Sequence, residues 1–273
     1  MELVLTDNEI EFILQEVHDH YGYDFSEYAK ASLSRRINRL YQMDKFSGFA
    51  DLRNRIINDK NYIKRFVEEI TVNVTEMFRD FSFFETLRKE VLPVLSTYPL
   101  IRIWHAGCST GEEVYSMTIL LKESGLLSKT IIYATDINPD VLQTAAKGIF
   151  PLSKMKSYSE NYLESGGKLE FSNYYTAIYD KAIFNEELRS RIVFATHNLV
   201  SDKSFNEFQL ILCRNVMIYF EKDLQDKVLQ LFNDSLDQLG FLALGSKETL
   251  RFSPVAPAFK IFSYKERIWR KIM

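Results

Sequence analysis

Hydrophobic residues recur at helical spacing through the first part of the chain. Four apolar residues fall on one face of a first helix: Ile10, Ile13, Leu14 and Val17. Thr6 or Asp7 can cap this helix, and a second helix is expected from about Ser26. Shorter helices are expected over residues 48–58 and 61–70. The pattern therefore predicts a small all-helical domain over the first seventy residues, 1–70.

Beyond residue 92 the pattern changes to short apolar runs separated by helical stretches. Runs typical of buried strands fall at 101–104, 130–135, 191–195, 208–212 and 241–244, with two more near 258–263 and 266–271. Helical stretches separate the earlier runs, and the last of these helices is expected over 222–239. Strands that alternate with helices predict an α/β fold with a doubly wound, mostly parallel sheet and a terminal antiparallel strand.

Two regions depart from this alternation. Residues 71–92 read as a linker and a helix that ends before Pro93, and they are unusually rich in phenylalanine. Polar and aromatic residues mix around 151–189, which predicts a small antiparallel β insertion. The insertion would lie inside a second domain formed by residues 93–273.

Composition narrows the class of protein. The chain has 273 residues, 46% of them hydrophobic and 26% charged, as in ordinary soluble globular proteins. A net charge of −3 argues against a nucleic-acid partner. Two cysteines and four histidines show no metal-site spacing, so no metal is expected. The start lacks a signal-peptide pattern and no apolar run reaches the length of a membrane span, so we expect a cytoplasmic protein without membrane insertion.

Charge is segregated along the helical domain. Residues 1–29 hold eight acidic and no basic residues, whereas residues 30–65 hold ten basic residues against three acidic ones. Within the basic segment, Arg35, Arg36 and Arg39 share one side of the second helix. They form either a solvated face or a docking surface for an acidic partner.

The stretch from residue 101 to residue 116 reads as strand, small-residue turn and helix, the unit that brings a backbone close to a nucleotide-like ligand. Gly107 and Gly111 lie in the turn. The G-x-G-x-x-G and phosphate-cradle motifs are absent, and Glu112 and Glu113 would repel a phosphate. A cationic ligand with hydroxyl groups, such as S-adenosylmethionine, fits better. A tight turn without any ligand is the alternative.

Polar residues at two other places are candidates for binding. Asp136 ends the second strand, where a carboxylate either binds ribose hydroxyls or caps the next helix. Asn73, Thr75 and Arg79 stand among aromatic residues. A guanidinium in such surroundings needs an anionic partner, which is either structural or a substrate.

Five strings, taken in order, carry a resemblance to a known family: TVNVTEMFRD, HAGCSTGEEVYS, ATDI, NL at 198–199, and CRNVMIYF. Together they resemble the CheR-type chemotaxis-receptor methyltransferases, and the resemblance covers essentially the whole chain. It implies a fold of the class I methyltransferase type. It also implies methyl transfer from S-adenosyl-L-methionine, leaving S-adenosyl-L-homocysteine, to glutamate carboxylates on the helical cytoplasmic region of methyl-accepting chemotaxis receptors.

The resemblance also implies roles for individual residues. Asn73, Thr75 and Arg79 would border cofactor and substrate, and Gly107 would lie in the cofactor loop. Glu113 would contact the methionine end of the cofactor, Asp136 the ribose, and Asn198 with Leu199 the adenine. Arg214, Asn215 and Tyr219 would lie near the reacting groups. Of these residues, Arg79 would orient the substrate carboxylate by a forked hydrogen bond, and Tyr219 would steady the carboxylate or the cofactor.

The sequence departs from the family at two places and leaves other functions open. Val114 stands where proline is common, and GSKET at 245–249 replaces a glycine-histidine-serine-glutamate string. A methyltransferase for amines would carry an Asn/Asp-Pro-Pro-aromatic string where this chain has CRNVMIYF. A non-catalytic module that senses S-adenosylmethionine, or an enzyme for another protein or small-molecule acceptor, remains an alternative. We expect a monomer.

Overall fold

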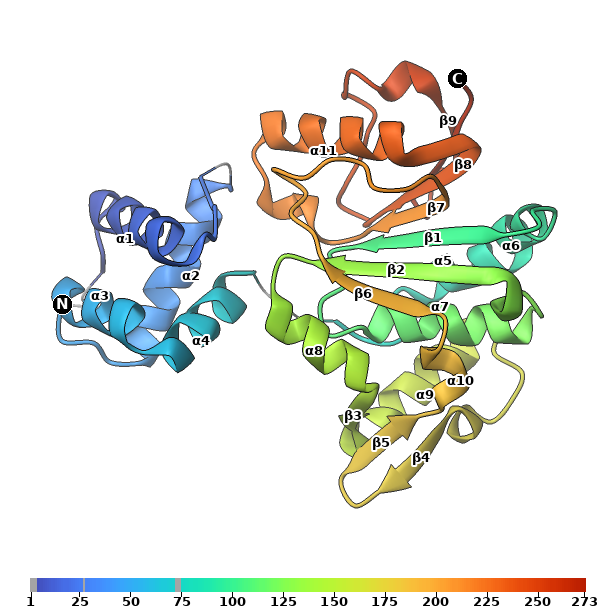
Figure 1. Ribbon diagram of the computed structural model, residues 1–273, viewed down its shortest axis with the longest axis horizontal. Coiled ribbons are helices and arrows are strands. Elements are labelled where there is room, and N and C mark those ends of the chain that lie inside the picture. Colours follow the sequence, from blue (N-terminus) through green and yellow to red (C-terminus); the bar gives the residue numbers. More distant parts are fainter. Residues whose placement is uncertain (1–3, 27, 72–74) are drawn as a thin grey trace. The chain divides into compact units, whose positions relative to one another are not determined.

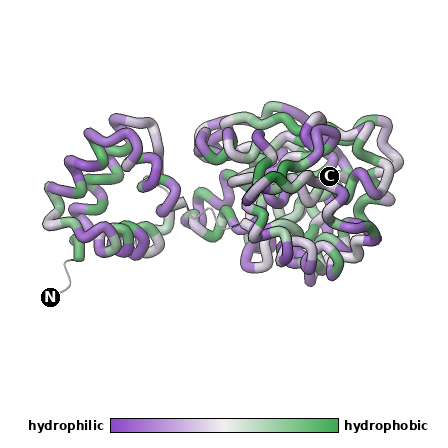
Figure 2. Tube along the Cα trace, turned by 90° about the horizontal axis from the view of Figure 1, so that it is seen from below, coloured by the Kyte–Doolittle hydropathy of each residue, from purple (hydrophilic) through white to green (hydrophobic). Residues whose placement is uncertain are grey.

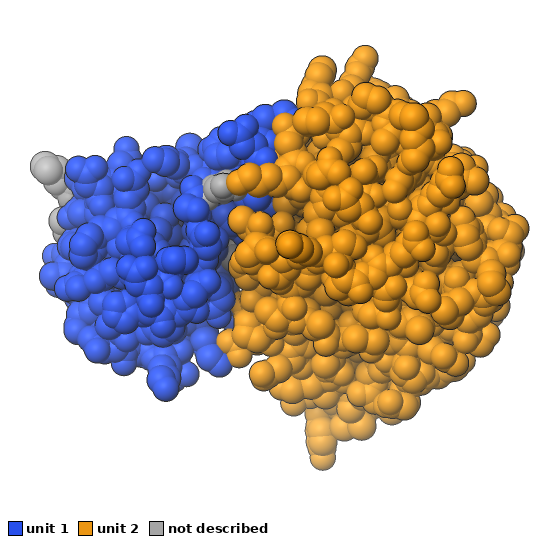
Figure 3. Space-filling view, turned by 45° about the horizontal axis from the view of Figure 1, so that its top comes forward, with its two compact units in different colours: residues 1–74, 219–225 blue, residues 75–218, 226–273 orange. Residues whose placement is uncertain are grey.

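The computed structural model describes residues 4–26, 28–71 and 75–273 (Figure 1). By their contacts, the described residues form two compact units (Figure 3). The helical unit comprises residues up to position 74 together with Tyr219–Gln225. The larger unit comprises Thr75–Ile218 and Asp226–Met273. Each unit is described here by itself.

Four helices build the helical unit: α1 (Asp7–Tyr21), α2 (Lys30–Met43), α3 (Phe49–Asn58) and α4 (Lys60–Thr71). Hydrophilic and hydrophobic residues alternate along their turns (Figure 2). Thr6 caps α1 in a capping box with Glu9, as one of the two predicted caps. The prediction that the second helix starts at Ser26 was wrong, since α2 begins at Lys30. The preceding residues instead bury Phe25 and Tyr28 against the unit's core.

A short segment distant in sequence completes the helical unit. The backbone N–H of Ala29 donates to the carbonyl oxygen of Tyr219 at 2.8 Å. The rings of Tyr28 and Phe220 meet edge to face with centroids 5.0 Å apart. The Arg36 guanidinium lies over the Tyr219 ring, 4.2 Å from its centroid. Because these contacts join residues almost two hundred positions apart, no local pattern in the sequence could predict them.

The larger unit contains a seven-stranded sheet in the order β6-β2-β1-β7-β8-β10-β9. Five strands run parallel: β1 (Ile101–Ala106), β2 (Thr130–Asp136), β6 (Ile192–Thr196), β7 (Phe208–Cys213) and β8 (Leu236–Leu244). β10 (Ile268–Lys271) is antiparallel to β8 and to the edge strand β9 (Phe259–Ser263). This topology confirms the predicted doubly wound, mostly parallel α/β sheet with a terminal antiparallel strand.

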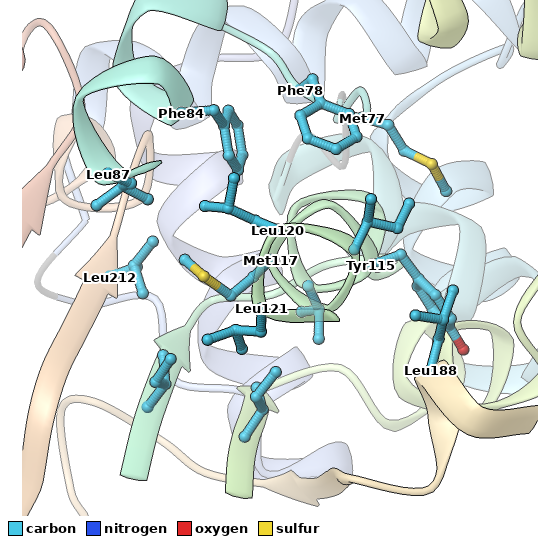
Figure 4. Packing of buried hydrophobic residues seen from close by; sticks show 14 of the residues in the cluster. Met77, Phe78, Phe84, Leu87, Tyr115, Met117, Leu120, Leu121, Leu188 and Leu212 are labelled. Carbon is cyan, nitrogen blue, oxygen red and sulfur yellow. The ribbon is translucent and has the colours of Figure 1, made fainter. Parts of the chain in front are cut away.

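Helices pack on both faces of this sheet. Ile101 and Ile103 of β1 join the core cluster that includes α7 (Glu112–Glu123). Trp104, on the other face because side chains alternate along a strand, packs edge to face on Phe232 of α11 (Lys222–Ser235). Helix α8 (Pro139–Lys147) contacts β2 and β6. Figure 4 shows Met117 and Leu120 of α7 among the core side chains.

Two predicted helix ends were wrong. The helix expected over 222–239 ends at Ser235, and β8 begins at the next residue because Leu236 pairs with Phe208 of β7. The helix expected to stop before Pro93 continues as α5 (Phe81–Thr86), a π-helical turn (Leu87–Val91) and α6 (Leu92–Leu95). Pro93 lies in the first turn of α6, where its missing N–H is tolerated.

The insertion forms a separate three-stranded antiparallel sheet, as predicted, in the order β3-β5-β4. Its strands are β3 (Ile149–Pro151), β4 (Tyr175–Ile178) and β5 (Lys181–Phe184). The sequence did not predict its helix α9 (Met155–Glu164), and a short helix α10 (Glu186–Arg189) follows. Short 3₁₀ turns complete the chain: Leu127–Lys129, Leu152–Lys154, Phe171–Tyr174, Met217–Tyr219 and Ala256–Ala258.

Candidate active site

The order in which the chain adds strands to the sheet reverses beside β1, and this reversal indicates where a ligand would bind. From β1 the chain moves outward through β2 to β6, and it then crosses back to place β7 on the other side of β1. In open α/β sheets, ligands bind outside the carboxyl ends of the strands at such a switch point. The loops after β1, β2, β6 and β7 meet at this edge, and they carry most of the predicted site residues.

The loop after β1 is tight and close to the loop after β7. The backbone N–H groups of Gly107 and Cys108 donate to the carbonyl oxygen of Thr135 at 2.8 and 2.9 Å. Gly107 has φ +78°, and a Cβ atom there would lie 2.5 Å from Val216 Cγ2. A side chain at position 107 would therefore be strained and would clash, so this close approach requires glycine.

Asp136 belongs to the loop network rather than to the cap of the following helix. Its carboxylate accepts the N–H of Ser109 at 2.9 Å and that of Asn138 at 3.0 Å. Burial raises the pKa of Asp136, although these backbone N–H groups oppose the shift. Asn138 caps α8 by accepting the N–H of Asp140. The Ser109 hydroxyl is buried with no partner among the described residues, so hydroxyl and carboxylate together can bind a polar ligand.

A charged network joins three segments of the larger unit. Arg214 donates from Nη1 to Glu113 Oε2 at 2.8 Å and from Nη2 to Asp80 Oδ2 at 2.6 Å. Its guanidinium lies 4.0 Å from the centroid of the Phe83 ring, and 4% of its side chain is exposed. The other Glu113 oxygen is 3.1 Å from His105 Nδ1. The network therefore fixes the predicted cofactor residues Glu113 and Arg214 against each other.

The balance of forces on Glu113 strongly favours its ionised form. Burial alone would raise the pKa of Glu113, but the hydrogen bond from His105 and the charge of Arg214 outweigh burial. The pKa of Glu113 is consequently lowered from 4.5 to about 2. The sequence indicated neither His105 nor Asp80 as a partner. Asp80 and Arg214 are 134 positions apart, so no local pattern could show that pair.

Arg79 lies in a backbone segment of unusual conformation. The residues on either side of it, Phe78 and Asp80, have φ +52° and +57°. Such left-handed conformations are costly for residues other than glycine, and they persist only where the surroundings hold them. Phe78 is fully buried, and its N–H donates to Ser116 Oγ of α7 at 2.8 Å. Arg79 and Thr75 are half-buried, whereas Asn73 lies outside the described residues.

Glu248 supports the loop after β7. Its buried carboxylate accepts the N–H groups of Gly245 at 2.6 Å, Asn215 at 3.0 Å, Val216 at 3.0 Å and Ile218 at 3.3 Å. Burial raises the pKa of Glu248, and the four N–H groups oppose the shift. Asn215 has φ +62°, so the carboxylate holds a strained turn at the candidate site. The glutamate of the GSKET string was visible in the sequence, but its partners were not.

The loop after β6 adjoins the end of β2. The N–H of His197 donates to the carbonyl oxygen of Asp136 at 3.2 Å. Asn198 Oδ1 accepts the N–H of Val200 at 2.9 Å, and Leu199 is half-buried. The structure thus places Asn198 and Leu199 on the loop next to Asp136, where the adenine contact is predicted.

Tyr219 and the three arginines of α2 belong to the helical unit. Arg36 donates to the carbonyl oxygen of Ile70 and lies over the Tyr219 ring. Arg35 and Arg39 are exposed, with no ion pair among the residues that the structure describes. Of the three predicted docking cations, Arg36 is therefore already engaged. The role of Tyr219 in the reaction stays a prediction.

Comparison with known families identifies the chain. The family model described as "CheR methyltransferase, SAM binding domain" matches residues 73–266, and "CheR methyltransferase, all-alpha domain" matches residues 8–71. The chain belongs to the CheR methyltransferase family. It is therefore an S-adenosylmethionine-dependent methyltransferase by family. This membership confirms the resemblance and the cofactor that the sequence predicted.

Individual relatives of this CheR methyltransferase are similar along most of their length. A Pseudomonas putida protein provisionally named methyltransferase Cher3 is 48% identical over 267 residues, covering 97% of each chain. A chemotaxis protein methyltransferase of Borreliella burgdorferi is 31% identical, covering 92% of this chain and 91% of the relative. A crystal structure from Methanococcus maripaludis, provisionally described as an S-adenosyl-L-methionine-dependent methyltransferase, is 12% identical with a TM-score of 0.39, covering 70% and 84%.

The residues present fit the family's cofactor. Gly107 leaves no space for a side chain, and the unpartnered Ser109 hydroxyl and the Asp136 carboxylate offer polar contacts. The loop and the start of α7, residues 106–113, contain two glutamates and no lysine or arginine, which suits a cationic ligand better than a phosphate. No described helix is long and apolar enough to cross a membrane, and no described cluster of His, Cys, Asp or Glu could hold a metal ion.

The lowered pKa of Glu113 predicts how stability depends on pH. Its stabilising effect should be fully present above about pH 4.5 and should be lost as the pH falls towards 2. Glu113→Gln should lower the free energy of unfolding by about 3 kcal/mol at pH 7 and by progressively less below pH 4.5. Urea titrations at pH 7, 5, 4 and 3 measure this, with the exposed Glu160→Gln as control. A difference that stayed constant with pH would contradict the network.

Asp136 predicts an effect on cofactor affinity. Asp136→Ala removes the carboxylate and leaves the ligand's donors unpaired, at a cost of about 1–3 kcal/mol. The affinity for S-adenosylhomocysteine, measured by titration calorimetry, should fall about ten- to a hundredfold. Because Ser109 and Asn138 also lose an acceptor, the melting temperature must be measured on the same sample. Asp180→Ala, an exposed change in the insertion, is the control, and unchanged affinity in a folded Asp136 variant would exclude Asp136 from the site.

Proposed function

We propose that this CheR methyltransferase methylates glutamate side chains on the helical cytoplasmic region of chemotaxis receptors, forming methyl esters. Relatives named chemotaxis protein methyltransferases, such as those of Borreliella burgdorferi and Salmonella typhimurium, support this proposal. The structural observation that carries it is the strained segment around Arg79, which Asp80 joins to Arg214 and Glu113. Through Asp80 and Arg214 this segment is connected to Glu113, which follows the predicted cofactor loop.

The chemistry of the acceptor agrees with the residues present. When bound, S-adenosylmethionine supplies an electrophilic methyl group. A glutamate carboxylate is already ionised at neutral pH, so the protein need not remove a proton from it. The carboxylates of Asp80, Glu113 and Asp136 are each engaged by guanidinium or N–H groups, as suits residues that position rather than accept protons. Positioning by a rigid site can supply about 7–11 kcal/mol of barrier reduction.

Individual roles follow from this proposal. Arg79 would orient the substrate carboxylate through a forked hydrogen bond, and Tyr219 would steady the carboxylate or the cofactor. Asn73, Thr75 and Asn215 would border the reacting groups, and Asn198 with Leu199 would hold the adenine. The exposed Arg35 and Arg39 would dock acidic helices of the receptor. The protein would act in the cytoplasm as a monomer.

A methyl-transfer assay tests the proposal. Purified protein is incubated with tritiated S-adenosylmethionine and cytoplasmic fragments of chemoreceptors, and the labelled fragments are then treated with base. Methyl esters hydrolyse in base and release volatile methanol, whereas methylated amines keep their label. Base-stable label would indicate an amine acceptor. Cofactor binding without any label in receptor fragments or cell lysate would favour a module that only senses the cofactor.

A further inference from the structure

The turn after β8 and the β9–β10 hairpin enclose a pocket of about 240 Å³ in the larger unit. Lys247, Arg251 and Arg267 contribute cations to its lining, and Phe252 and Tyr264 contribute aromatic rings. The same turn contains Glu248, whose carboxylate holds the loop after β7, so the pocket adjoins the candidate active site without including its predicted binding residues. Strands β10 and β9 lie at one edge of the seven-stranded sheet, and the C-terminus lies near β9 (Figure 1).

The surroundings of the pocket carry an excess of positive charge. Residues 245–273 hold seven basic residues and two acidic ones. Both acidic residues are occupied, since Glu248 accepts four backbone N–H groups and Glu266 pairs with Lys265 at 3.4 Å. Lys247, Arg251 and Arg267 form no ion pair among the described residues. A protein of net charge −3 thus concentrates unpaired cations at one place.

Exposed aromatic rings stand beside these cations. Phe252 is 77% exposed and Tyr264 is 63% exposed, so two large rings stand at the surface close to the cations. The Arg267 guanidinium lies over the Tyr264 ring, 4.9 Å from its centroid. Stacking of this kind leaves the N–H groups at the edge of the guanidinium free to bind a carboxylate in its plane.

We propose that this pocket docks an acidic segment of a protein partner, in which an aromatic residue stands between carboxylates. The ring of that residue would pack on Phe252 and Tyr264, and its flanking carboxylates would meet Lys247, Arg251 and Arg267. The site is separate from Arg35 and Arg39, which lie in the helical unit. The inference therefore goes beyond the proposed function and does not require glutamate methylation.

The pocket suits spread carboxylates better than a single phosphate group. A phosphate site gathers backbone N–H groups around the anion. Here the turn uses its own N–H groups: Gly245 donates to the Glu248 carboxylate, Glu248 donates to the carbonyl of Gly245, and Arg251 donates to Thr249 Oγ1. Lys247 and Arg251 are exposed, and no group of free backbone N–H donors is described beside them. Several charges distributed along an extended segment match this arrangement.

A labelled peptide serves as the probe. Binding of a fluorescein-labelled Glu-Glu-Phe-Glu-Glu amide to the full chain is measured by fluorescence anisotropy at 50 and 300 mM salt. We expect affinity to weaken about tenfold in the double variant Lys247→Ala/Arg251→Ala and to fall with salt. The double variant Lys156→Ala/Arg191→Ala removes the same charge elsewhere in the larger unit and should bind as the parent does. Unchanged affinity for S-adenosylhomocysteine shows that each variant is folded.

A double-mutant cycle tests the aromatic part. Phe252→Ala should weaken binding of this peptide severalfold, yet it should hardly change binding of the peptide with alanine in place of phenylalanine. No binding to the parent protein, or equal binding by all variants, would overturn the proposal. A single-stranded oligonucleotide that bound more tightly than the peptide, and lost affinity in the Lys247/Arg251 variant, would also overturn it, because a nucleic acid would then be the better ligand.

Discussion

Replacing Arg79 with lysine is expected to reduce the turnover of methyl transfer about a hundred- to a thousandfold while cofactor affinity changes much less. Lysine keeps the positive charge but lacks the planar fork that aligns a carboxylate. A loss of this size is typical when one preorganised donor to a reacting group is removed. The strained backbone at Phe78 and Asp80 should persist in the variant, because Phe78 is held by Ser116 and Asp80 by Arg214.

Single-turnover rates and S-adenosylhomocysteine titrations on the same preparation measure the two effects separately. Arg102→Lys is a matched control, since Arg102 is a half-buried arginine near the amino end of β1, away from the candidate site. Equal losses in rate and in cofactor affinity would show that Arg79 serves the cofactor alone. An unchanged rate would remove Arg79 from the list of catalytic residues.

The order of elements was predictable because apolar periodicity is a local property. The runs that became β1, β2, β6, β7 and β8 are short and bulky, and their alternation with helices restricts the topology to few choices. The same alternation places Gly107 and Asp136 at the carboxyl ends of the parallel strands β1 and β2. The prediction failed where pairing between strands overrode the local pattern: the helix expected over 222–239 ends at Ser235, because Leu236 pairs with Phe208 and begins β8.

Partners that are distant in sequence could not be predicted. Asp80 binds Arg214, which is 134 positions away and in turn binds Glu113, so these contacts depend on the complete fold. The GSKET string was noted only as a departure from the family, yet the carboxylate of its Glu248 fixes the turn at Asn215. A single sequence shows which residues carry charge, whereas their pairing requires the tertiary structure.

The same reason changes the interpretation of the basic face of α2. From the sequence, Arg35, Arg36 and Arg39 were three equivalent residues of either a solvated face or a docking surface. In the structure, Arg36 binds the carbonyl of Ile70 and stacks on Tyr219, so it joins α2 to the segment Tyr219–Gln225 within the helical unit. Arg35 and Arg39 remain exposed. A variant with all three arginines replaced would therefore lose both the proposed docking contacts and a contact that stabilises the helical unit, so its methylation rate could not be assigned to docking alone.

Arg35→Glu/Arg39→Glu, with Arg36 left intact, is expected to reduce receptor methylation about a hundredfold at low salt. Reversal of two charges replaces attraction to acidic receptor helices by repulsion, and juxtaposed like charges cost several kcal/mol. Added salt should lower the rate of the parent protein but not that of the variant, because salt screens the attraction in the first and the repulsion in the second. The melting temperature and the affinity for S-adenosylhomocysteine should hardly change, since exposed charges contribute little to folding.

Two further variants make this test decisive. Lys45→Glu/Lys60→Glu reverses the same number of exposed charges in the helical unit but outside α2, and it should keep most of the methylation rate. Arg36→Ala should lower the melting temperature, because it removes the hydrogen bond to Ile70 and the contact with Tyr219. If the Arg35/Arg39 variant methylates receptor fragments normally at low salt, the two arginines are a solvated face. If its melting temperature falls in proportion to its rate, the arginines support the fold instead of docking the receptor.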